Sequence, residues 1–287
     1  MVSFGIRHNS ASKTGLVVTV NWTKEKRPNG ERTPSKSFEE LKRDVPKTAD
    51  GVAEDGDKQE FIEEIPVTVS KRTQRPEAAY YQDYNPVPGG CQIQNASNSN
   101  YCTLTAPAYN FDRNEDVLIT AGHCVSWSKG TTIYQPLSTY QKLGESTDFA
   151  STNNKLDVGE LKRFGHDAKY RLASKSSGYD YYILGILSIN HLKDMAYYGQ
   201  YLTLQGRTSG RVGARVLEVT SDERWVIMDY ETSGGDSGGP WFDIQNTDEA
   251  YIAGVHNGTI DHDGDGSYDE AYASTAVKAE EALNIQF

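Results

Sequence analysis

The chain has 287 residues, with a formal net charge of −11 and 37% hydrophobic residues. This length is enough for one large or two ordinary domains. The negative charge argues against a nucleic-acid partner, because a phosphate backbone would be repelled. The sequence also lacks any apolar run of about 18 residues, so we expect no transmembrane helix. Its 18 tyrosines and 26 glycines favour an all-β protein with many turns.

Residues 1–84 predict a small module of their own. Residues 15–22 and 61–69 are rich in β-branched residues and predict strands, the second at a sheet edge because a proline interrupts it. Residues 37–43 between them predict a short helix that begins at a capping serine. We therefore expect a β-α-β module that serves as a propeptide, a docking module, a lid or a structural extension. Residues 80–90, with three tyrosines and two prolines, predict an extended linker.

Short strands separated by Gly, Asn and Asp recur from residue 101 onward, a pattern typical of a barrel or a sandwich. Residues 116–120 predict a strand that ends just before His123. Residues 141–156 are polar and predict an insertion between strands. Residues 275–283 are rich in helix formers and predict a terminal helix.

Two short motifs carry the chemistry: Thr-Ala-Gly-His-Cys at 120–124 and Gly-Gly-Asp-Ser-Gly-Gly-Pro at 234–240. A serine such as Ser237 is a weak nucleophile until a neighbouring base removes its proton, and His123 supplies a suitable imidazole. The glycines let the backbone turn tightly around Ser237. We expect the N–H groups of Gly235 and Ser237 to point at one position, where they would stabilise the oxyanion formed on the substrate.

Both motifs closely resemble the signatures of trypsin-like (chymotrypsin-fold) serine peptidases, and the short bacterial and glutamyl-specific members are the most similar. The resemblance covers residues 85–287 and implies a mainly β fold of two antiparallel six-stranded barrels with a C-terminal helix. Residues 201–210 look like the strand and turn that open the second barrel, and 212–218 and 224–230 look like neighbouring strands within it. The domain starts with a Gly-Gly pair at 89–90 instead of Ile-Val-Gly-Gly, which argues against activation by a freed N-terminal ammonium.

The resemblance also implies a carboxylate that orients the imidazole of His123. Asp180 is the preferred candidate, because it lies midway between His123 and Ser237 and precedes an apolar strand, as the family's aspartate does. Asp157 and Asp167 are the alternatives, and both are more easily interpreted as exposed carboxylates in turns.

The chain has three cysteines, which allow one disulfide and one free thiol. In the resembling family, cysteines at the places of Cys102 and Cys124 form a disulfide beside the histidine. Such a bridge implies an oxidising compartment and an extracellular protein. The alternative is two ordinary buried thiols in a cytoplasmic protein. Cys91 has no evident partner and is expected to be a small buried residue.

The residues around the specificity pocket carry two conflicting signals. Glu231 stands where members specific for Lys and Arg place an aspartate, which favours basic substrates. His256, on a strand that runs to Thr259, resembles the pocket histidine of glutamyl-specific members, and Thr232, five residues before Ser237, resembles their pocket threonine. A charged imidazole with hydroxyl groups beside it accepts a carboxylate well. We therefore prefer cleavage after Glu or Asp over cleavage after basic residues.

An acidic loop near the C-terminus follows the first half of a calcium-binding loop, with alternating carboxylates and a glycine at the sixth place. The closing glutamate at the twelfth place is replaced by a tyrosine, so a structural calcium ion and a solvated hairpin remain equal alternatives. The candidate ligands are Asp261, Asp263, Asp265 and Asp269.

The sequence thus predicts a serine endopeptidase in which His123, Asp180 and Ser237 cleave peptide bonds through an acyl-enzyme. No cofactor is expected in this chemistry. The expected partner is a protein or peptide substrate, with no nucleic acid and no membrane span, and the protein is expected to be a monomer. A catalytically silent peptide-binding homologue and an esterase with the same three residues are the rival functions.

Overall fold

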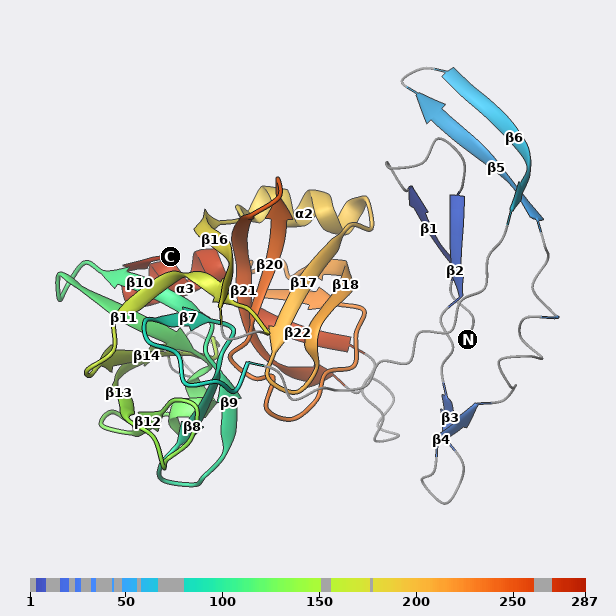
Figure 1. Ribbon diagram of the computed structural model, residues 1–287. Coiled ribbons are helices and arrows are strands. Elements are labelled where there is room, and N and C mark those ends of the chain that lie inside the picture. Colours follow the sequence, from blue (N-terminus) through green and yellow to red (C-terminus); the bar gives the residue numbers. More distant parts are fainter. Residues whose placement is uncertain are drawn as a thin grey trace. The chain divides into compact units, whose positions relative to one another are not determined.

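The computed structural model describes residues 4–8, 16–20, 24–26, 32–34, 43, 48–55, 58–66, 80–150, 156–175, 178–260 and 270–287. The chain divides into two compact units, Met1–Arg75 and Pro76–Phe287 (Figure 1). No helix in these described ranges has the length and apolar character needed to cross a membrane.

The described part of the first unit consists of antiparallel hairpins. The paired strands are β1 (Phe4–His8) with β2 (Leu16–Val20), β3 (Lys24–Lys26) with β4 (Arg32–Pro34), and β5 (Thr48–Asp55) with β6 (Lys58–Pro66). The strands predicted at 15–22 and 61–69 are present as β2 and β6. The helix predicted at 37–43 lies, apart from Arg43, outside the described residues.

The segment predicted as a linker, residues 80–90, is part of the second unit. Tyr80 and Tyr84 are 1% and 2% exposed and belong to its hydrophobic core. Strand β7 (Val87–Gly89) pairs in parallel with β15 (Ala168–Ala173). The linker interpretation was therefore wrong, because the tyrosine rings bury their apolar surface against the domain, and the unit begins near residue 76 instead of 85.

The first barrel is an antiparallel sheet in the order β23-β10-β11-β14-β13-β12-β8-β9. It closes because β9 and β10 are successive segments of one chain, joined by Leu104 and Thr105, whose N–H groups donate to the carbonyl of Cys91, just before β8, and to that of Ile119 in β11. Its strands are β8 (Gln92–Asn95), β9 (Tyr101–Thr103), β10 (Ala106–Asn110), β11 (Glu115–Thr120), β12 (Thr132–Tyr134), β13 (Lys142–Ala150), β14 (Val158–Arg163) and the short β23 (Ile285–Gln286).

Strand β13 corrects the prediction of a polar insertion over residues 141–156. Its residues pair with β12 on one side and β14 on the other. Leu143 and Ala150 face the core, whereas most of the remaining side chains are partly exposed. The strand was missed because its polar outward face dominates its composition.

The second barrel is a closed six-stranded antiparallel sheet, since β20 pairs with both β17 and β21. The strand and turn predicted at 201–210 and the neighbouring strands predicted at 212–218 and 224–230 are all confirmed. The strands are β17 (Tyr201–Gly206), β18 (Gly210–Val219), β19 (Trp225–Met228), β20 (Pro240–Gln245), β21 (Glu249–Ile260) and β22 (Glu270–Thr275).

Two helices and one further strand complete the unit. Strand β16 (Tyr179–Ile186) pairs in parallel with β21. Helix α2 (Ile189–Tyr197) begins after Ser188, whose side chain accepts from the N–H of His191. Helix α3 (Ala276–Leu283) is the predicted terminal helix, and the side chain of Thr275 caps it.

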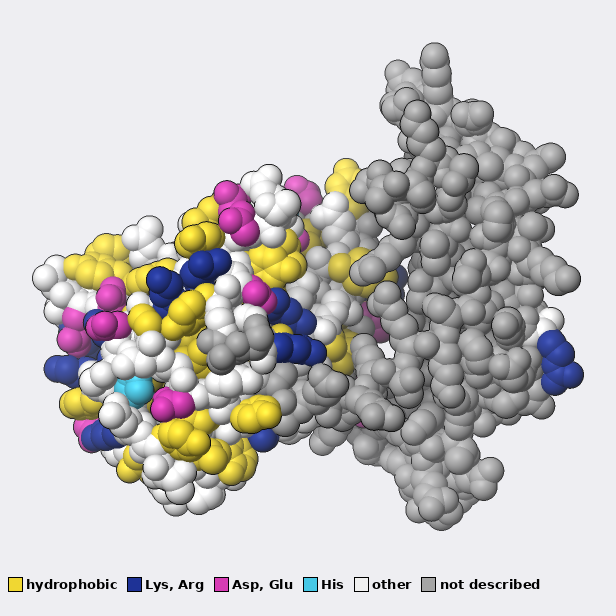
Figure 2. Space-filling model, in the orientation of Figure 1, with side chains coloured by type: hydrophobic (Ala, Val, Ile, Leu, Met, Phe, Trp, Pro, Cys, Tyr) yellow, Lys and Arg dark blue, Asp and Glu magenta, His cyan; other side chains and the backbone are white. Residues whose placement is uncertain are grey.

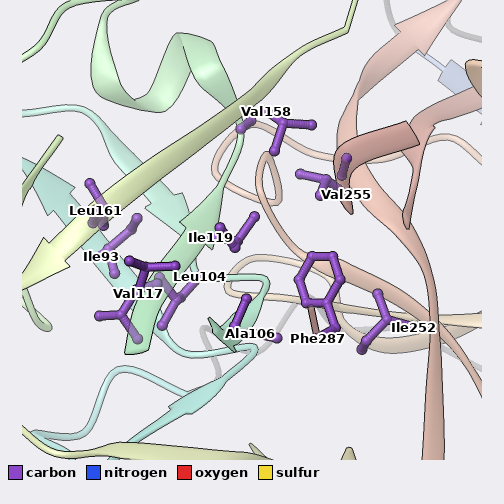
Figure 3. Packing of buried hydrophobic residues seen from close by; sticks show 14 of the residues in the cluster. Ile93, Leu104, Ala106, Val117, Ile119, Val158, Leu161, Ile252, Val255 and Phe287 are labelled. Atoms are coloured by element: carbon purple, nitrogen blue, oxygen red, sulfur yellow. The ribbon is translucent and has the colours of Figure 1, made fainter. Parts of the chain in front are cut away.

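Each barrel has its own buried cluster, and residues of the second barrel extend the first cluster. In Figure 3, Ile252 and Val255 of β21 and the C-terminal Phe287 lie beside the first-barrel core around Ile119. On the surface, charged side chains of both signs are interspersed with hydrophobic ones on the face shown in Figure 2. The shared core brings the end of β11 and the start of β14 close to the loop before β20, where the candidate site lies.

Candidate active site

His123 lies in a single turn of 3-10 helix, Gly122–Val125, directly after β11. The predicted disulfide is present: Cys124 is bonded to Cys102 of β9, with their Cα atoms 6.1 Å apart. The bridge fixes the histidine turn to the neighbouring strand. The His123 side chain keeps 38% of its surface exposed, so a reacting group can reach it.

Asp157, at the start of β14, binds His123 through both carboxylate oxygens. Oδ2 lies 2.6 Å from Nδ1 of the ring, and Oδ1 accepts from the backbone N–H of His123 at 2.9 Å. Asp157 is only 9% exposed. A carboxylate in this position holds the Nδ1–H tautomer and leaves Nε2 free to accept a proton.

The choice of Asp180 as the orienting carboxylate was therefore wrong. Asp180 lies within β16 and not in a turn before it, and its Oδ2 forms an ion pair with Nη1 of Arg211 at 2.5 Å. Asp167 is an exposed surface carboxylate beside Arg163, as predicted. Asp157, which looked like an exposed turn residue, is the one that reaches the ring.

Two residues of the second barrel hold the backbone of Asp157. Asn257 Nδ2 donates to the carbonyl of Asp157 at 2.6 Å, and the N–H of Asp157 donates to Ser274 Oγ at 3.0 Å. Ser274 in turn donates its N–H and its hydroxyl to Asn257 Oδ1. No local motif in the sequence marks this support, because it depends on strands β21 and β22 meeting the first barrel.

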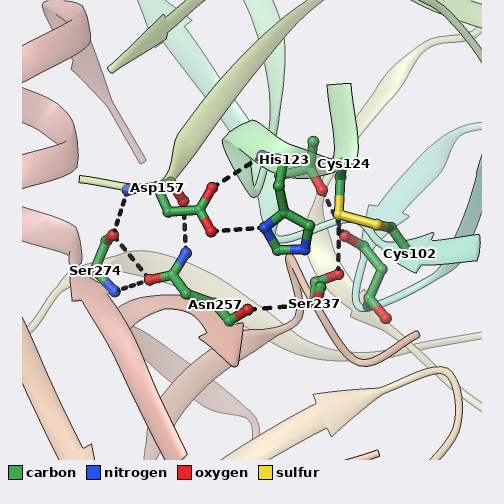
Figure 4. A network of polar contacts seen from close by, with 9 residues as sticks. Cys102, His123, Cys124, Asp157, Ser237, Asn257 and Ser274 are labelled. Atoms are coloured by element: carbon green, nitrogen blue, oxygen red, sulfur yellow. Dashed lines mark hydrogen bonds and ion pairs between the residues drawn. A yellow bond between two sulfur atoms is a disulfide. The ribbon is translucent and has the colours of Figure 1, made fainter. Parts of the chain in front are cut away.

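Ser237 lies on the other side of the imidazole from Asp157 (Figure 4). Its carbonyl accepts from the N–H of Thr103 at 2.8 Å and lies 3.6 Å from Sγ of Cys124. That sulfur is itself within 4.8 Å of a ring nitrogen of His123. The hydroxyl donates to the carbonyl of Asn257 at 3.5 Å, the outer limit of a hydrogen bond.

The glycines around Ser237 are required by the backbone. Gly235 has φ +99° and Gly238 has φ +81°, values that other residues rarely adopt. A Cβ on Gly238 would lie 2.2 Å from the carbonyl oxygen of Thr103. The N–H groups of Asp236, Gly238 and Gly239 all donate to carbonyls. The N–H groups of Gly235 and Ser237 have no acceptor within the described part of the chain, so both remain available to an oxyanion.

The carboxylate of Asp236 holds this loop in place through hydrogen bonds. It is fully buried and accepts from the N–H groups of Thr208, Ser209 and Ser233 and from the hydroxyl of Ser209. These donors satisfy the carboxylate from within the domain, without an N-terminal ammonium. Asp236 was not among the predicted site residues, although it directly precedes the serine.

The structure brings two of the four predicted pocket residues into contact: His256 Nε2 lies 3.1 Å from Thr232 Oγ1. The indole N–H of Trp241 donates to His256 Nδ1 at 3.3 Å, so the imidazole hydrogen is on Nε2 and points to the threonine. Glu231 is exposed, and Thr259 lies farther along β21, half-buried.

The imidazole of His256 is neutral, which corrects the expectation of a charged ring. It is 1% exposed, and burial, aided by the nearby ring of His123, lowers the pKa of His256 to about 3. Any carboxylate bound here would meet an N–H donor and a hydroxyl group instead of a cation.

The described residues provide no evidence for the predicted calcium site and hold no other usable metal site. The candidate calcium ligands Asp261, Asp263, Asp265 and Asp269 lie outside them, and their role stays a prediction. The sulfurs of Cys102 and Cys124 gather near His123, but they are joined in the disulfide and offer no thiolate.

Comparison with known proteins identifies the fold. No protein-family model matches the sequence, and no curated protein matches it either. A solved glutamic acid specific serine protease, described as using a novel histidine triad in substrate binding, is similar with a TM-score of 0.52 and 19% identity over 70% of this chain and 99% of that one. Protease A of Thermobifida fusca is similar with a TM-score of 0.50 and 17% identity over 70% and 97%. The chain therefore has the chymotrypsin-like fold that its motifs implied.

Proposed function

We propose that the second unit is a serine endopeptidase in which Ser237 is the nucleophile, His123 the general base and Asp157 the carboxylate that orients it. The observation that carries the proposal is the imidazole of His123, held at Nδ1 by Asp157 while Ser237 lies on its other side (Figure 4). The neighbouring N–H groups of Gly235 and Ser237 support it, because acyl transfer needs such donors.

The reaction follows from these positions. The Ser237 hydroxyl, which donates to the carbonyl of Asn257 in this structure, would turn to Nε2 of His123 before it reacts. As Oγ attacks the peptide carbonyl, His123 takes its proton, and the carbonyl oxygen becomes an anion bound by the N–H groups of Gly235 and Ser237. His123 then donates the proton to the leaving amine, and an acyl-enzyme remains. Water, deprotonated by His123, releases the acid and restores Ser237. Side chains and backbone supply every group this chemistry needs, so the proposal includes no cofactor.

The proposed preference is for Glu or Asp before the scissile bond, read by His256 and Thr232. Their hydrogen-bonded pair offers an N–H and a hydroxyl to a carboxylate. The similar glutamic acid specific protease is described as using a histidine triad in substrate binding, whereas the described side chains bonded to the ring of His256 here are those of Trp241 and Thr232. A preference for basic residues through the exposed Glu231 is the alternative.

The proposed substrate is a protein or peptide, and the proposed location is extracellular, supported by the disulfide between Cys102 and Cys124. We expect the protein to act as a monomer. The rival functions are an esterase and a silent peptide-binding homologue.

Covalent labelling tests the nucleophile. A fluorophosphonate should label the wild-type chain on Ser237, as peptide mapping would show, and should not label the Ser237→Ala variant. Turnover of matched amide and ester substrates then separates a peptidase from an esterase. A folded wild-type chain that neither reacts with the probe nor cleaves any peptide would rule the proposal out.

Specificity is tested with fluorogenic peptides that differ only in the residue before the cut. Peptides with Glu should exceed their Gln counterparts in kcat/KM, and Thr232→Val should reduce this preference while the Gln peptide changes little. Equal turnover of Glu and Gln peptides would remove the acidic preference, and faster turnover of Lys peptides would favour the role of Glu231.

A further inference from the structure

Arg207 lies in the turn after β17, half-buried beside the loop that carries Ser237. Its Nε donates to Gln92 Oε1 at 2.7 Å, and its guanidinium lies over the ring of Tyr101, 4.5 Å from the centroid. A Cβ added to Gly235 would come within 2.9 Å of Nη1 of Arg207. The guanidinium is therefore held in one orientation next to an N–H proposed to bind the oxyanion.

Arg207 has no carboxylate partner among the described residues. Charges of both signs are interspersed on the face of this unit shown in Figure 2, and most of its described arginines pair with a carboxylate. The five that form ion pairs with aspartate or glutamate are Arg113, Arg163, Arg211, Arg215 and Arg224. The two terminal nitrogens of Arg207 have no hydrogen-bond acceptor within the described ranges, so they present a fork that matches a carboxylate.

Asp236 is the acidic side chain that acts on Arg207 electrostatically, but it does not occupy this fork. Its oxygens accept from Thr208, Ser209 and Ser233. Burial lowers the pKa of Arg207 from its ordinary value, and the guanidinium nevertheless stays charged at neutral pH. Part of the charge balances Asp236, and the hydrogen-bond donors remain for a ligand.

The position of Arg207 decides which part of a substrate it meets. Tyr101, on which it stacks, precedes Cys102, while Asn257 follows His256 of the proposed pocket. In Figure 4, Cys102 and Asn257 lie on opposite sides of Ser237. If the side chain before the cut enters at His256, the residues after the cut leave toward Tyr101 and Arg207.

Resting on the proposed peptidase function, we propose that Arg207, stacked on Tyr101, binds a carboxylate in the leaving-group part of the substrate, on the first or second residue after the scissile bond. This is a second acidic recognition site, separate from the pair of His256 and Thr232. It makes the enzyme favour cuts that precede an acidic residue.

The test uses internally quenched peptides with the same residue before the cut and a single Gln or Glu at the first, second or fifth place after it. In the wild type, Glu at the first or second place should raise kcat/KM about tenfold over Gln, close to the lower limit for a hydrogen bond to a charged group, because the site is partly exposed. Glu at the fifth place should have no such effect. Arg207→Gln should bring the ratio close to 1, and Arg207→Lys should leave an intermediate ratio.

Arg215→Gln is the matched control, since Arg215 is exposed and paired with Asp229, and it should keep the wild-type ratio. A wild-type ratio of 1 at both near places, or a ratio unchanged in Arg207→Gln, would overturn the inference. So would an equal slowing of all peptides and of a short anilide, because Arg207 would then only support the loop at Gly235. If the wild type cleaves nothing, the peptidase proposal fails, but the inference on Arg207 can still be tested. Calorimetry then compares the binding of peptides that match the segment after the cut, with Glu or with Gln, to the Ser237→Ala chain. Equal binding of the two peptides would overturn the inference.

Discussion

Replacing Asp157 and Asp180 separately by asparagine tests the assignment on which the mechanism depends. In Asp157→Asn, the amide oxygen can still accept from the backbone N–H of His123, as Oδ1 does now at 2.9 Å. The amide nitrogen then faces Nδ1, where the 2.6 Å contact requires an acceptor for Nδ1–H. The ring must place its hydrogen on Nε2 instead, and Nε2 can no longer take the proton of Ser237.

The expected loss in kcat for Asp157→Asn is about 10⁴-fold, which corresponds to roughly 5 kcal/mol of transition-state stabilisation. The fold should survive, because Asn257 and Ser274 bind the backbone of residue 157 and not its side chain. Asp180→Asn removes a partly exposed ion pair with Arg211, which also bonds to Gln205, and should cost about 1 kcal/mol of stability or less. Its kcat should stay near that of the wild type.

The assay is steady-state hydrolysis of one anilide by the wild type and both variants, with thermal unfolding followed by circular dichroism. A loss of several orders of magnitude in kcat for Asp180→Asn, with Asp157→Asn within tenfold of the wild type, would refute the role assigned to Asp157.

Three further predictions follow from the same geometry. His256 has a pKa of about 3 in the fold against about 6.5 in an unfolded chain, so its contribution to stability is present above pH 6.5 and is lost as the pH falls toward 3. Urea unfolding at pH 5 should therefore show a free energy of unfolding about 2 kcal/mol lower than at neutral pH, and the His256→Gln variant should lack this loss. Parallel stability–pH curves for the two proteins would contradict the prediction. Gly235→Ala places a Cβ against Arg207 at a residue whose φ is +99°, so the backbone must move and the N–H proposed to bind the oxyanion is displaced. The kcat should fall about 10- to 100-fold, whereas an unchanged kcat would show that Gly235 is not part of the oxyanion site. Reducing the bridge between Cys102 and Cys124, which are separated by 22 residues, should lower the free energy of unfolding by about 3 kcal/mol. Chemical denaturation with and without reductant measures this loss, and a Cys102→Ala/Cys124→Ala variant is the control, because reductant should not change its midpoint.

The sequence predicted the parts of the site that depend on local backbone chemistry. The glycines around Ser237 are needed because of their positive φ values, and the strand before His123 ends in four successive buried residues. The terminal helix followed from the same kind of local signal, because its helix formers lie within the helix itself. The second-barrel strands followed instead from the resemblance to trypsin-like peptidases.

The carboxylate was missed because its environment is made by residues far away in the chain. Asp180 has the expected pattern, a polar turn before a strand, yet its carboxylate meets Arg211 across the sheet. Asp157 looked exposed, although its neighbours Leu156 and Val158 are both buried. A carboxylate between two apolar residues at the start of a strand was the available signal. Tyr80 was misjudged for a related reason, since only the folded domain provides the surface that covers it.

Each barrel contributes hydrogen bonds that hold a site segment of the other barrel. Asp157 belongs to the first barrel, and its backbone is bound by Asn257 and Ser274 of the second. The Ser237 loop belongs to the second barrel, and Thr103 of the first binds the carbonyls of Ser237 and Gly235. Each barrel therefore donates hydrogen bonds to the other on both sides of the site. A shift of one barrel relative to the other would strain the bonds that hold Asp157 and the bonds that hold the Ser237 loop. The alignment of the proposed proton acceptor, hydroxyl and oxyanion donors therefore depends on the interface between the barrels. This explains why the short motifs point to the proposed chemistry but not to its third residue.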